Sequence, residues 1–391
     1  MRHGKKMGNK RFPPSALCLQ VVSMSTVTYA QQGKCGDPFK DVGRLRFSTA
    51  YWQKTDFCKH SVPYDEIFSG GPPPNGIPPI DRPHFETVAA AERWLSAQSP
   101  VIALQIGEDV RAYPLAILIW HEIVNDTVGG VPVAVTFCPL CNSALVFDRR
   151  VDGHVLRFGV SGNLRKSDLV MWDEQTQSWW QQITGEVIVG ALTGARLALI
   201  GSQVVSFEAF KRAFPHGKVL SRETGHDRSY GRNPYTSYDS NPRPFLFEGE
   251  IDPRLSATEP VLAGIVDGVA IAYPFSALRR EITLNDTIES VPVVAFWQDG
   301  AVSALDRSDI DSSRRVGMAA LYKRQLDGQM LTFERSKDGS LRDLETGSTW
   351  DIFGRALEGS LAGAQLVRLP ANLHFWFAWA AFQPKTRLCG Q

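Results

Sequence analysis

Two cysteines three positions apart are the strongest chemical feature of this sequence. Cys138-Pro139-Leu140-Cys141 stands between residues 131–137 and 143–148, two runs rich in β-branched and aromatic residues that predict strands joined by a tight turn. Two thiols on such a turn can point to the same side. They could then bind a metal ion, exchange disulfides, or brace the hairpin, and these three chemistries need different partners.

The first hypothesis is an exported binding protein for a soft metal ion. A tetrahedral zinc site usually takes its four ligands from two such pairs, and the sequence has no second pair, so we expect copper rather than zinc. His121, just before the strand that leads to Cys138, is the expected third ligand. Met171 is a weaker candidate for a thioether fourth ligand, with core packing as its alternative.

The second hypothesis is a thiol–disulfide oxidoreductase with Cys138 as nucleophile and Cys141 as resolving thiol. The turn is similar to the active turn of glutaredoxin-like and Dsb-like enzymes, where a helix N-terminus lowers the pKa of the first cysteine. Here a strand-like run, 142–147, follows the turn instead. The third hypothesis is a non-catalytic scaffold or interaction protein with structural cysteines. Whether the protein is an enzyme stays open.

A long internal repeat organises the chain. Residues 109–135 align with residues 268–295 at a shift of 160, and the similarity resumes at Asp173 and Asp343. Matches in three blocks in the same order indicate two divergent copies of one unit. The second copy has other residues at the positions of the proposed ligands: Glu281 for His121, Gln298-Asp299-Gly300 for the cysteine turn, and Leu341 for Met171. A site kept by one copy and lost by the other would leave this pattern.

The periodicity predicts a mainly β fold (α+β), with short helices at 86–96, 207–214 and 375–382. We expect a signal peptide at 1–30, an N-terminal extension at 31–85 that wraps the first copy, the first copy with the cysteine turn at 86–220, a turn-rich linker at 221–250, and the second copy at 251–391. The linker carries Tyr230, Tyr235 and Tyr238, which leave room for a loop that packs over a site.

The N-terminus indicates a periplasmic or secreted bacterial protein, because basic residues 1–11 precede a mildly apolar stretch, 16–30. Five positive charges lie within 1–30, so removing this segment would change the net charge from +1 to −4. An acidic chain offers no basic face for nucleic acid. We also find no nucleotide-binding motif and no membrane-spanning run after residue 30. An oxidising compartment would permit a disulfide, for which Cys35 and Cys58 are a plausible pair.

Other polar and aromatic residues are candidates to line a ligand site. Trp179 and Trp180 stand close to Asp173, and aromatic side chains beside an acid suit ligand stacking, with core packing as the alternative. Asn125, in the repeated Asn-Asp-Thr motif, is a further candidate. The sequence names neither a substrate nor a protein or small-molecule partner.

Several long motifs resemble a bacterial family known as domain of unknown function 3179. They are WHEIVND, TFCPLCNSALVFDR, FGVSGNLRKSDLVMWD, SWWQQITGE and HFWFAWAAFQP. The resemblance runs from about Asp56 to Pro384 and includes His121, Cys138 and Cys141. It implies an often exported protein and carries over no catalytic residue.

Overall fold

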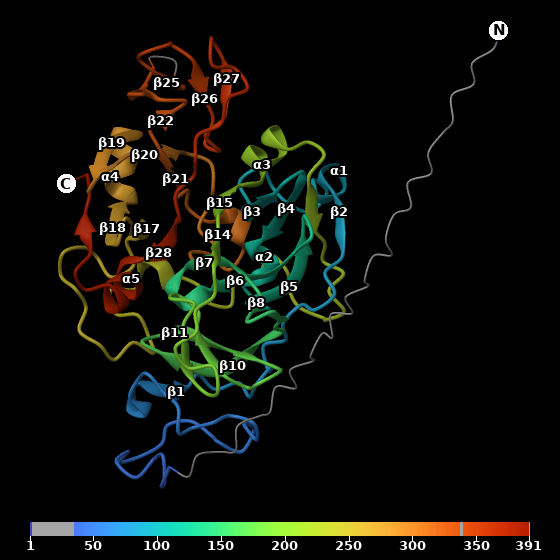
Figure 1. The fold of residues 1–391 in the computed structure, drawn as a ribbon, viewed down its shortest axis with the longest axis vertical. Helices are drawn as coiled ribbons and strands as arrows, with labels where there is room; N and C mark the ends of the chain where they lie inside the picture. The colour runs from blue at the N-terminus through green and yellow to red at the C-terminus, as the bar shows by residue number, and fades with distance from the viewer. Residues whose placement is uncertain (2–34, 337–338, 391) are drawn as a thin grey trace. The chain divides into compact units, whose positions relative to one another are not determined.

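Antiparallel β-strands are the predominant regular structure of this protein, and its helices are short (Figure 1). This confirms the mainly β class that the periodicity predicts. The computed structural model describes residue 1, residues 35–336 and residues 339–390. Apart from residue 1, the predicted signal peptide lies outside the described residues, so it stays a prediction. The described residues from Asp37 onward form one compact unit.

Three sheets make up the first half of that unit. The first has the order β15 (Ser202–Ser206), β3 (Pro100–Ile106), β4 (Asp109–Pro114), β16 (Lys218–Leu220), β2 (Phe85–Thr87). The second has the order β14 (Leu199–Ile200), β7 (Ser143–Asp148), β6 (Val131–Cys138), β5 (Ile123–Val128). The third has the order β1 (Ile67–Ser69), β10 (Phe158–Arg165), β11 (Asp168–Asp173), β12 (Trp179–Gln181), β13 (Val187–Val189).

Three corresponding sheets make up the second half. They are β28 (Ala371–Phe375), β17 (Pro260–Val266), β18 (Val269–Pro274), β29 (Arg387–Leu388); then β19 (Thr283–Ile288), β20 (Val291–Gln298), β21 (Met318–Lys323); and β24 (Phe333–Arg335), β25 (Leu341–Asp343), β26 (Thr349–Trp350), β27 (Ala356–Glu358). Two-stranded ribbons complete the strands: β8 (Arg150–Val151) with β9 (His154–Val155), and β22 (Gln325–Leu326) with β23 (Gln329–Met330).

The α-helices are α1 (Val88–Ala91), α2 (Leu115–Leu118), α3 (Phe207–Ala213), α4 (Phe275–Glu281) and α5 (Trp376–Phe382). The 3-10 turns are η1 (Tyr64–Glu66), η2 (Pro139–Cys141), η3 (Tyr238–Ser240) and η4 (Ile310–Ser312). The predicted helix at 86–96 is reduced to α1, because Phe85–Thr87 pair with β16 and Thr87 then caps the helix through its side chain. No described helix has the length and apolar character needed to cross a bilayer.

The two halves use the same strand registers. Asn125 faces Ala134 in the β5–β6 hairpin, and Asn285 faces Val294 in the β19–β20 hairpin, again at a shift of 160. The first sheet of each half also contains one parallel pair, β4 with β16 and β18 with β29. These likenesses fit two copies of one unit. That origin, and the domain boundaries set from it, stay predictions.

Hydrophobic packing joins the halves. One buried cluster combines β6 and β7 with Val261, Phe375 and Trp376 of the second half. Another combines α1 and Val205 with strands β20 and β21. Because β28 packs on β7 and β15 packs on β21, each half completes part of the other's core.

Candidate metal centre

The cysteine turn ends one strand and begins the next. Cys138 is the last residue of β6, Pro139–Cys141 form the 3-10 turn η2, and β7 begins at Ser143. Proline suits the first position of such a turn because its φ is already restricted, and Asn142 takes the left-handed conformation, with φ of 46°, that asparagine tolerates. Three residues of 3-10 turn form no α-helix that could lower the pKa of the Cys138 thiol.

A second hairpin reaches the thiols from another sheet. Arg165 at the end of β10 pairs with Asp168 at the start of β11, and both residues of the turn between them have positive φ. That geometry is typical of a tight two-residue hairpin turn. The carbonyl oxygen of Ser167 in this turn accepts from Cys141 Sγ at 3.4 Å and lies 4.0 Å from Cys138 Sγ. The hairpin turn therefore sits directly on the cysteine turn.

The two turns bring together three candidate metal ligands. The sulfurs of Cys138 and Cys141 and a carboxylate oxygen of Asp168 lie within 4.8 Å of one another. The three residues are at most 2% exposed. Asp168 Oδ2 accepts hydrogen bonds from Gln181 Nε2 at 2.6 Å and Ile183 N at 3.0 Å, whereas Oδ1 has no hydrogen-bond partner of good geometry among the described residues. One carboxylate oxygen is therefore held in place while the other is available.

Burial sets the protonation of this cluster. It raises the pKa of both thiols, and it raises the pKa of the Asp168 carboxyl to about 6. Glu122 is also buried, and its pKa is raised to about 8, first by burial and then by the charge of Asp168. Without a metal ion, both thiols and Glu122 are protonated at neutral pH. An ion that binds the sulfurs must displace the thiol protons.

The segment predicted as a linker covers the cysteine turn. Tyr238 is buried, and its hydroxyl donates a 2.9 Å hydrogen bond to the carbonyl oxygen of Leu140. Burial raises the pKa of Tyr238, and the thiolate forms of the two cysteines would raise it further. The backbone of Phe245, in the same segment, accepts from the Ser167 hydroxyl at 3.3 Å. Residues 221–250 therefore close over both turns that carry the candidate ligands.

His121 is not brought into the group of three ligands. Its Nδ1 lies 2.6 Å from the carbonyl oxygen of Pro78 and its Nε2 lies 2.7 Å from the Tyr230 hydroxyl. Burial lowers the pKa of His121 to about 4, so the ring is neutral. The structure thus places the predicted third ligand in a hydrogen-bond chain to the covering segment, and Asp168 stands beside the sulfurs instead.

Met171 lies in β11, opposite Val160 and Trp180 in the strand register, and it is fully buried in the main hydrophobic cluster. This is the packing environment that the alternative interpretation of Met171 expects. The structure groups the two thiols with an oxygen donor rather than with a thioether.

Asn125 braces the fold in a way that the second half repeats. Its amide nitrogen donates to the carbonyl oxygen of Phe158 at 2.8 Å, and its amide oxygen accepts from the same residue's N–H at 3.0 Å. Asn285 makes the same two bonds with Phe333, at 2.7 and 2.9 Å. Since the second half lacks the cysteines, this contact serves the fold and not the cysteine site.

Asp173 and Trp180 also form a contact that the second half repeats. Trp180 Nε1 donates to Asp173 Oδ2 at 3.0 Å, and Trp350 Nε1 donates to Asp343 Oδ2 at the same distance. Trp179 instead packs edge-on against aromatic side chains of the N-terminal segment, with ring centroids 5.1 Å from Phe47 and 5.2 Å from Trp52. These candidate ligand-lining residues therefore hold strands and the N-terminal segment together.

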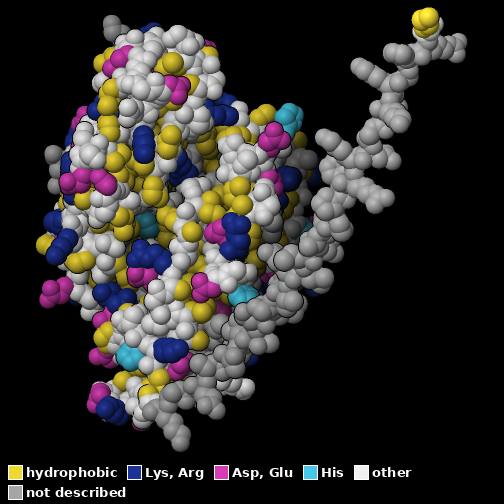
Figure 2. Space-filling view, viewed as in Figure 1, with side chains coloured by type: hydrophobic (Ala, Val, Ile, Leu, Met, Phe, Trp, Pro, Cys, Tyr) yellow, Lys and Arg dark blue, Asp and Glu magenta, His cyan; other side chains and the backbone are white. Residues whose placement is uncertain are grey.

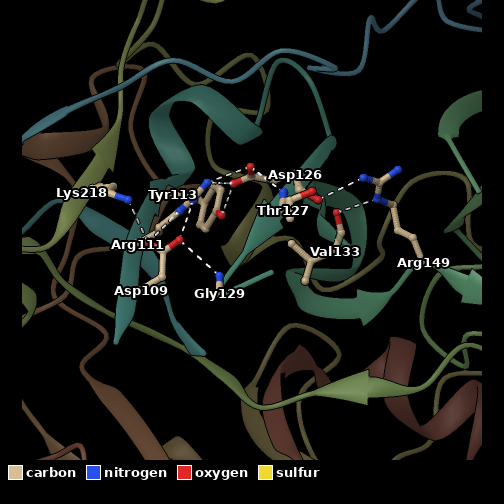
Figure 3. Close-up of polar contacts among 9 residues, drawn as sticks. All are labelled: Asp109, Arg111, Tyr113, Asp126, Thr127, Gly129, Val133, Arg149 and Lys218. Carbon is tan, nitrogen blue, oxygen red and sulfur yellow. Dashed lines mark hydrogen bonds and ion pairs between the residues drawn. The ribbon is translucent and has the colours of Figure 1, made fainter. Parts of the chain in front are cut away.

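A polar network around Asp126 is likewise structural (Figure 3). Arg111 bridges Asp109 and Asp126, and the Tyr113 hydroxyl donates to Asp126 Oδ2 at 2.6 Å. Figure 3 also shows Arg149 donating to backbone oxygens of Asp126 and Val133. The second half repeats the central bond between Tyr273 and Asp286, at 3.0 Å. The acids of this network are paired with Arg111 and Lys218, and Arg149 is held by backbone oxygens, which leaves no charge directed at a ligand.

The cysteines of the N-terminal segment differ from those of the site. Cys35 and Cys58 are both disulfide-bonded, whereas Cys138, Cys141 and Cys389 are free and buried. The pairing of Cys35 with Cys58 stays a prediction.

Fold and site together define a mainly β protein of two similar halves, with a buried dithiol–carboxylate cluster in the first. The chain belongs to the family described as protein of unknown function DUF3179, whose model matches residues 74–386. This confirms the family predicted from the motifs. No curated protein and no solved structure matches the chain.

Proposed function

We propose that this protein binds one thiolate-preferring metal ion through Cys138, Cys141 and Asp168. The observation that supports this most is the meeting of two free thiols with a carboxylate within 4.8 Å, in a place closed to solvent. A buried carboxylate oxygen whose only neighbouring donors are weak thiols is costly, and an ion would satisfy it. The second half keeps the structural contacts described above but has no cysteine turn.

The donor set affects which ion we expect. The two sulfurs by themselves favour copper(I), because soft thiolate ligands prefer a soft ion. The carboxylate is a harder donor. Two thiolates and a carboxylate carry three negative charges, and a divalent ion neutralises two of them whereas copper(I) neutralises one. Because uncompensated charge is expensive in a buried place, we favour Zn²⁺ and keep copper(I) as the alternative.

Thiol–disulfide exchange is less well supported by the same geometry. A redox-active cysteine needs an accessible thiolate with a lowered pKa. Cys138 is 2% exposed, and burial raises the pKa of its thiol. The turn that follows is a short 3-10 turn rather than an α-helix. The buried, protonated thiols suit an ion that is taken up and retained.

Metal analysis of the purified full chain tests the proposal. The protein is loaded separately with Zn²⁺ and, under reducing conditions, with copper(I), then dialysed and measured for metal per chain. We expect one retained ion and its loss in Cys138→Ser, Cys141→Ser and Asp168→Asn. Cys389→Ser is the matched control, because Cys389 is also a free, buried cysteine but lies in the second half.

Two results would contradict the proposal. One is wild-type protein that retains neither ion although its thiols remain reduced, which would favour a purely structural role for the cysteines. The other is a Cys389→Ser variant that loses as much metal as Cys138→Ser. Retention of copper(I) with no retention of Zn²⁺ would overturn only our preference for a divalent ion.

A further inference from the structure

A cavity of about 840 Å³ lies between the two halves, and Lys166 of the β10–β11 hairpin turn is part of its lining. Its walls come from both halves, with Phe147 and Ile183 from the first and Ala263 and Trp379 from the second. The volume falls within the range of small-molecule sites, which are mostly apolar with a few placed polar groups. Figure 2 looks onto the hollow between the halves, where hydrophobic side chains adjoin lysine or arginine.

The charged residues of the cavity leave one cation without an acidic partner. Arg165 pairs with Glu66, and Arg196 pairs with Glu186. Lys166 also lines the cavity, and its ammonium donates to the carbonyl oxygen of Ala381 at 3.1 Å. No acidic partner of Lys166 is found within ion-pair distance in the part of the chain that the structure describes. The cavity lining therefore has excess positive charge.

His374 adds a second polar group that the fold does not explain. It lies in β28, lines the cavity and is 1% exposed, and its Nδ1 is buried without a hydrogen-bond partner among the described residues. Its ring packs on Trp379 with centroids 5.2 Å apart. The strand register gives Val205 as its counterpart in β15, since His374 pairs with Val261 and Val205 pairs with Val101. Strand packing at this position thus accepts an apolar side chain.

The corresponding cavity of the other junction is smaller and has no histidine in its printed lining, although Arg368, which donates to the carbonyl oxygen of Ser202, gives it a cation as well. It is lined by Ala103, the counterpart of Ala263, and by Tyr322, the counterpart of Phe147, and its volume is about 450 Å³. The larger, histidine-containing cavity is therefore a departure from the repeated pattern. A buried polar group that departs from its counterpart, in a cavity also lined by a cation without an acidic partner, indicates a ligand site.

We infer that this cavity binds a medium-chain carboxylate: an apolar chain along the hydrophobic walls, with its head group near Lys166 and His374. Lys166 would pair with the carboxylate. The neutral imidazole of His374 can donate one hydrogen bond, which would satisfy its unpartnered nitrogen. The inference does not depend on the metal proposal, because none of the three metal ligands lines the cavity.

Calorimetry with three ten-carbon probes tests this. Decanoate, decanol and decyltrimethylammonium are titrated into the full chain, all below micelle formation. We expect decanoate to bind at least about tenfold more tightly than decanol, because only the carboxylate can form a charge-assisted contact with Lys166. The cationic probe should not bind, because Lys166 would repel it. Lys166→Met should abolish the preference for decanoate and leave decanol binding unchanged. Lys323→Met, at an exposed lysine outside the cavity, is the matched control.

The wild-type comparison decides the matter even if a variant fails to fold. Equal binding of decanoate and decanol, or no binding of either, would overturn the inference. So would an unchanged preference in a folded Lys166→Met protein. His374→Val copies the residue of the other half and should weaken decanoate several-fold without affecting decanol.

Discussion

The buried His374 should make this protein acid-sensitive, and its replacement should remove part of that sensitivity. Burial lowers the pKa of His374 from 6.5 to about 3. The folded state thus keeps the ring neutral while the unfolded chain takes up a proton. Because of this pKa difference between the folded and unfolded states, the free energy of unfolding has its full value above about pH 6.5 and decreases as the pH falls towards 3. Across that window the loss is about 5 kcal/mol, and it reaches about 2 kcal/mol at pH 5.

The perturbation is His374→Val, which copies Val205 in the corresponding strand. Urea unfolding followed by tryptophan fluorescence at pH 8 and at pH 5 gives the free energy of unfolding of each protein. We expect the decrease between the two pH values to be smaller in the variant by about 2 kcal/mol. His154→Val serves as the control, because His154 is exposed in the β8–β9 ribbon, and its decrease should equal that of the wild type.

An equal decrease in wild type and His374→Val would refute the reasoning, because it would mean that the ring is solvated or protonated in the folded state. A larger decrease in the variant would refute it as well. A change in the dependence of the free energy on urea concentration would show that the unfolding transition itself had changed, and direct NMR titration of the His374 ring would then measure the same pKa.

Two further substitutions test the structural assignments. Gly162 has φ of +78°, and a Cβ there would lie 2.0 Å from the Pro72 carbonyl oxygen, so Gly162→Ala should destabilise the protein by more than about 2 kcal/mol in urea unfolding. Gly153→Ala, at similar φ with open space around it, should cost only about 1 kcal/mol, and equal costs would contradict the close contact. Asn125→Ala should cost about 2–3 kcal/mol and leave the metal content unchanged, whereas Asn285→Ala, at an exposed position, should cost less. Loss of metal in Asn125→Ala would instead give Asn125 a role at the site.

Much of the local structure follows from the sequence. Alternating β-branched residues predict the strands on either side of the cysteine turn, and a proline between closely spaced cysteines predicts a tight turn. These features depend on neighbouring residues, whose propensities and spacing can be read along the chain. The same holds for α3 and α5, which the structure confirms at nearly the predicted bounds. The long motifs likewise predict the family.

The composition of the candidate site depended on tertiary structure. Cys138 and Cys141 meet because they share one turn, whereas Asp168 reaches them only because the β10–β11 hairpin, in a different sheet, packs on that turn. The position of His121 in the sequence suggested a metal ligand. In the folded chain both ring nitrogens are instead within hydrogen-bond distance of the Pro78 carbonyl oxygen and the Tyr230 hydroxyl. Burial by residues 221–250 then sets which groups carry protons. Which side chains come into contact, and which are shielded from water, both depend on packing between residues far apart in the sequence. The local sequence pattern specifies neither.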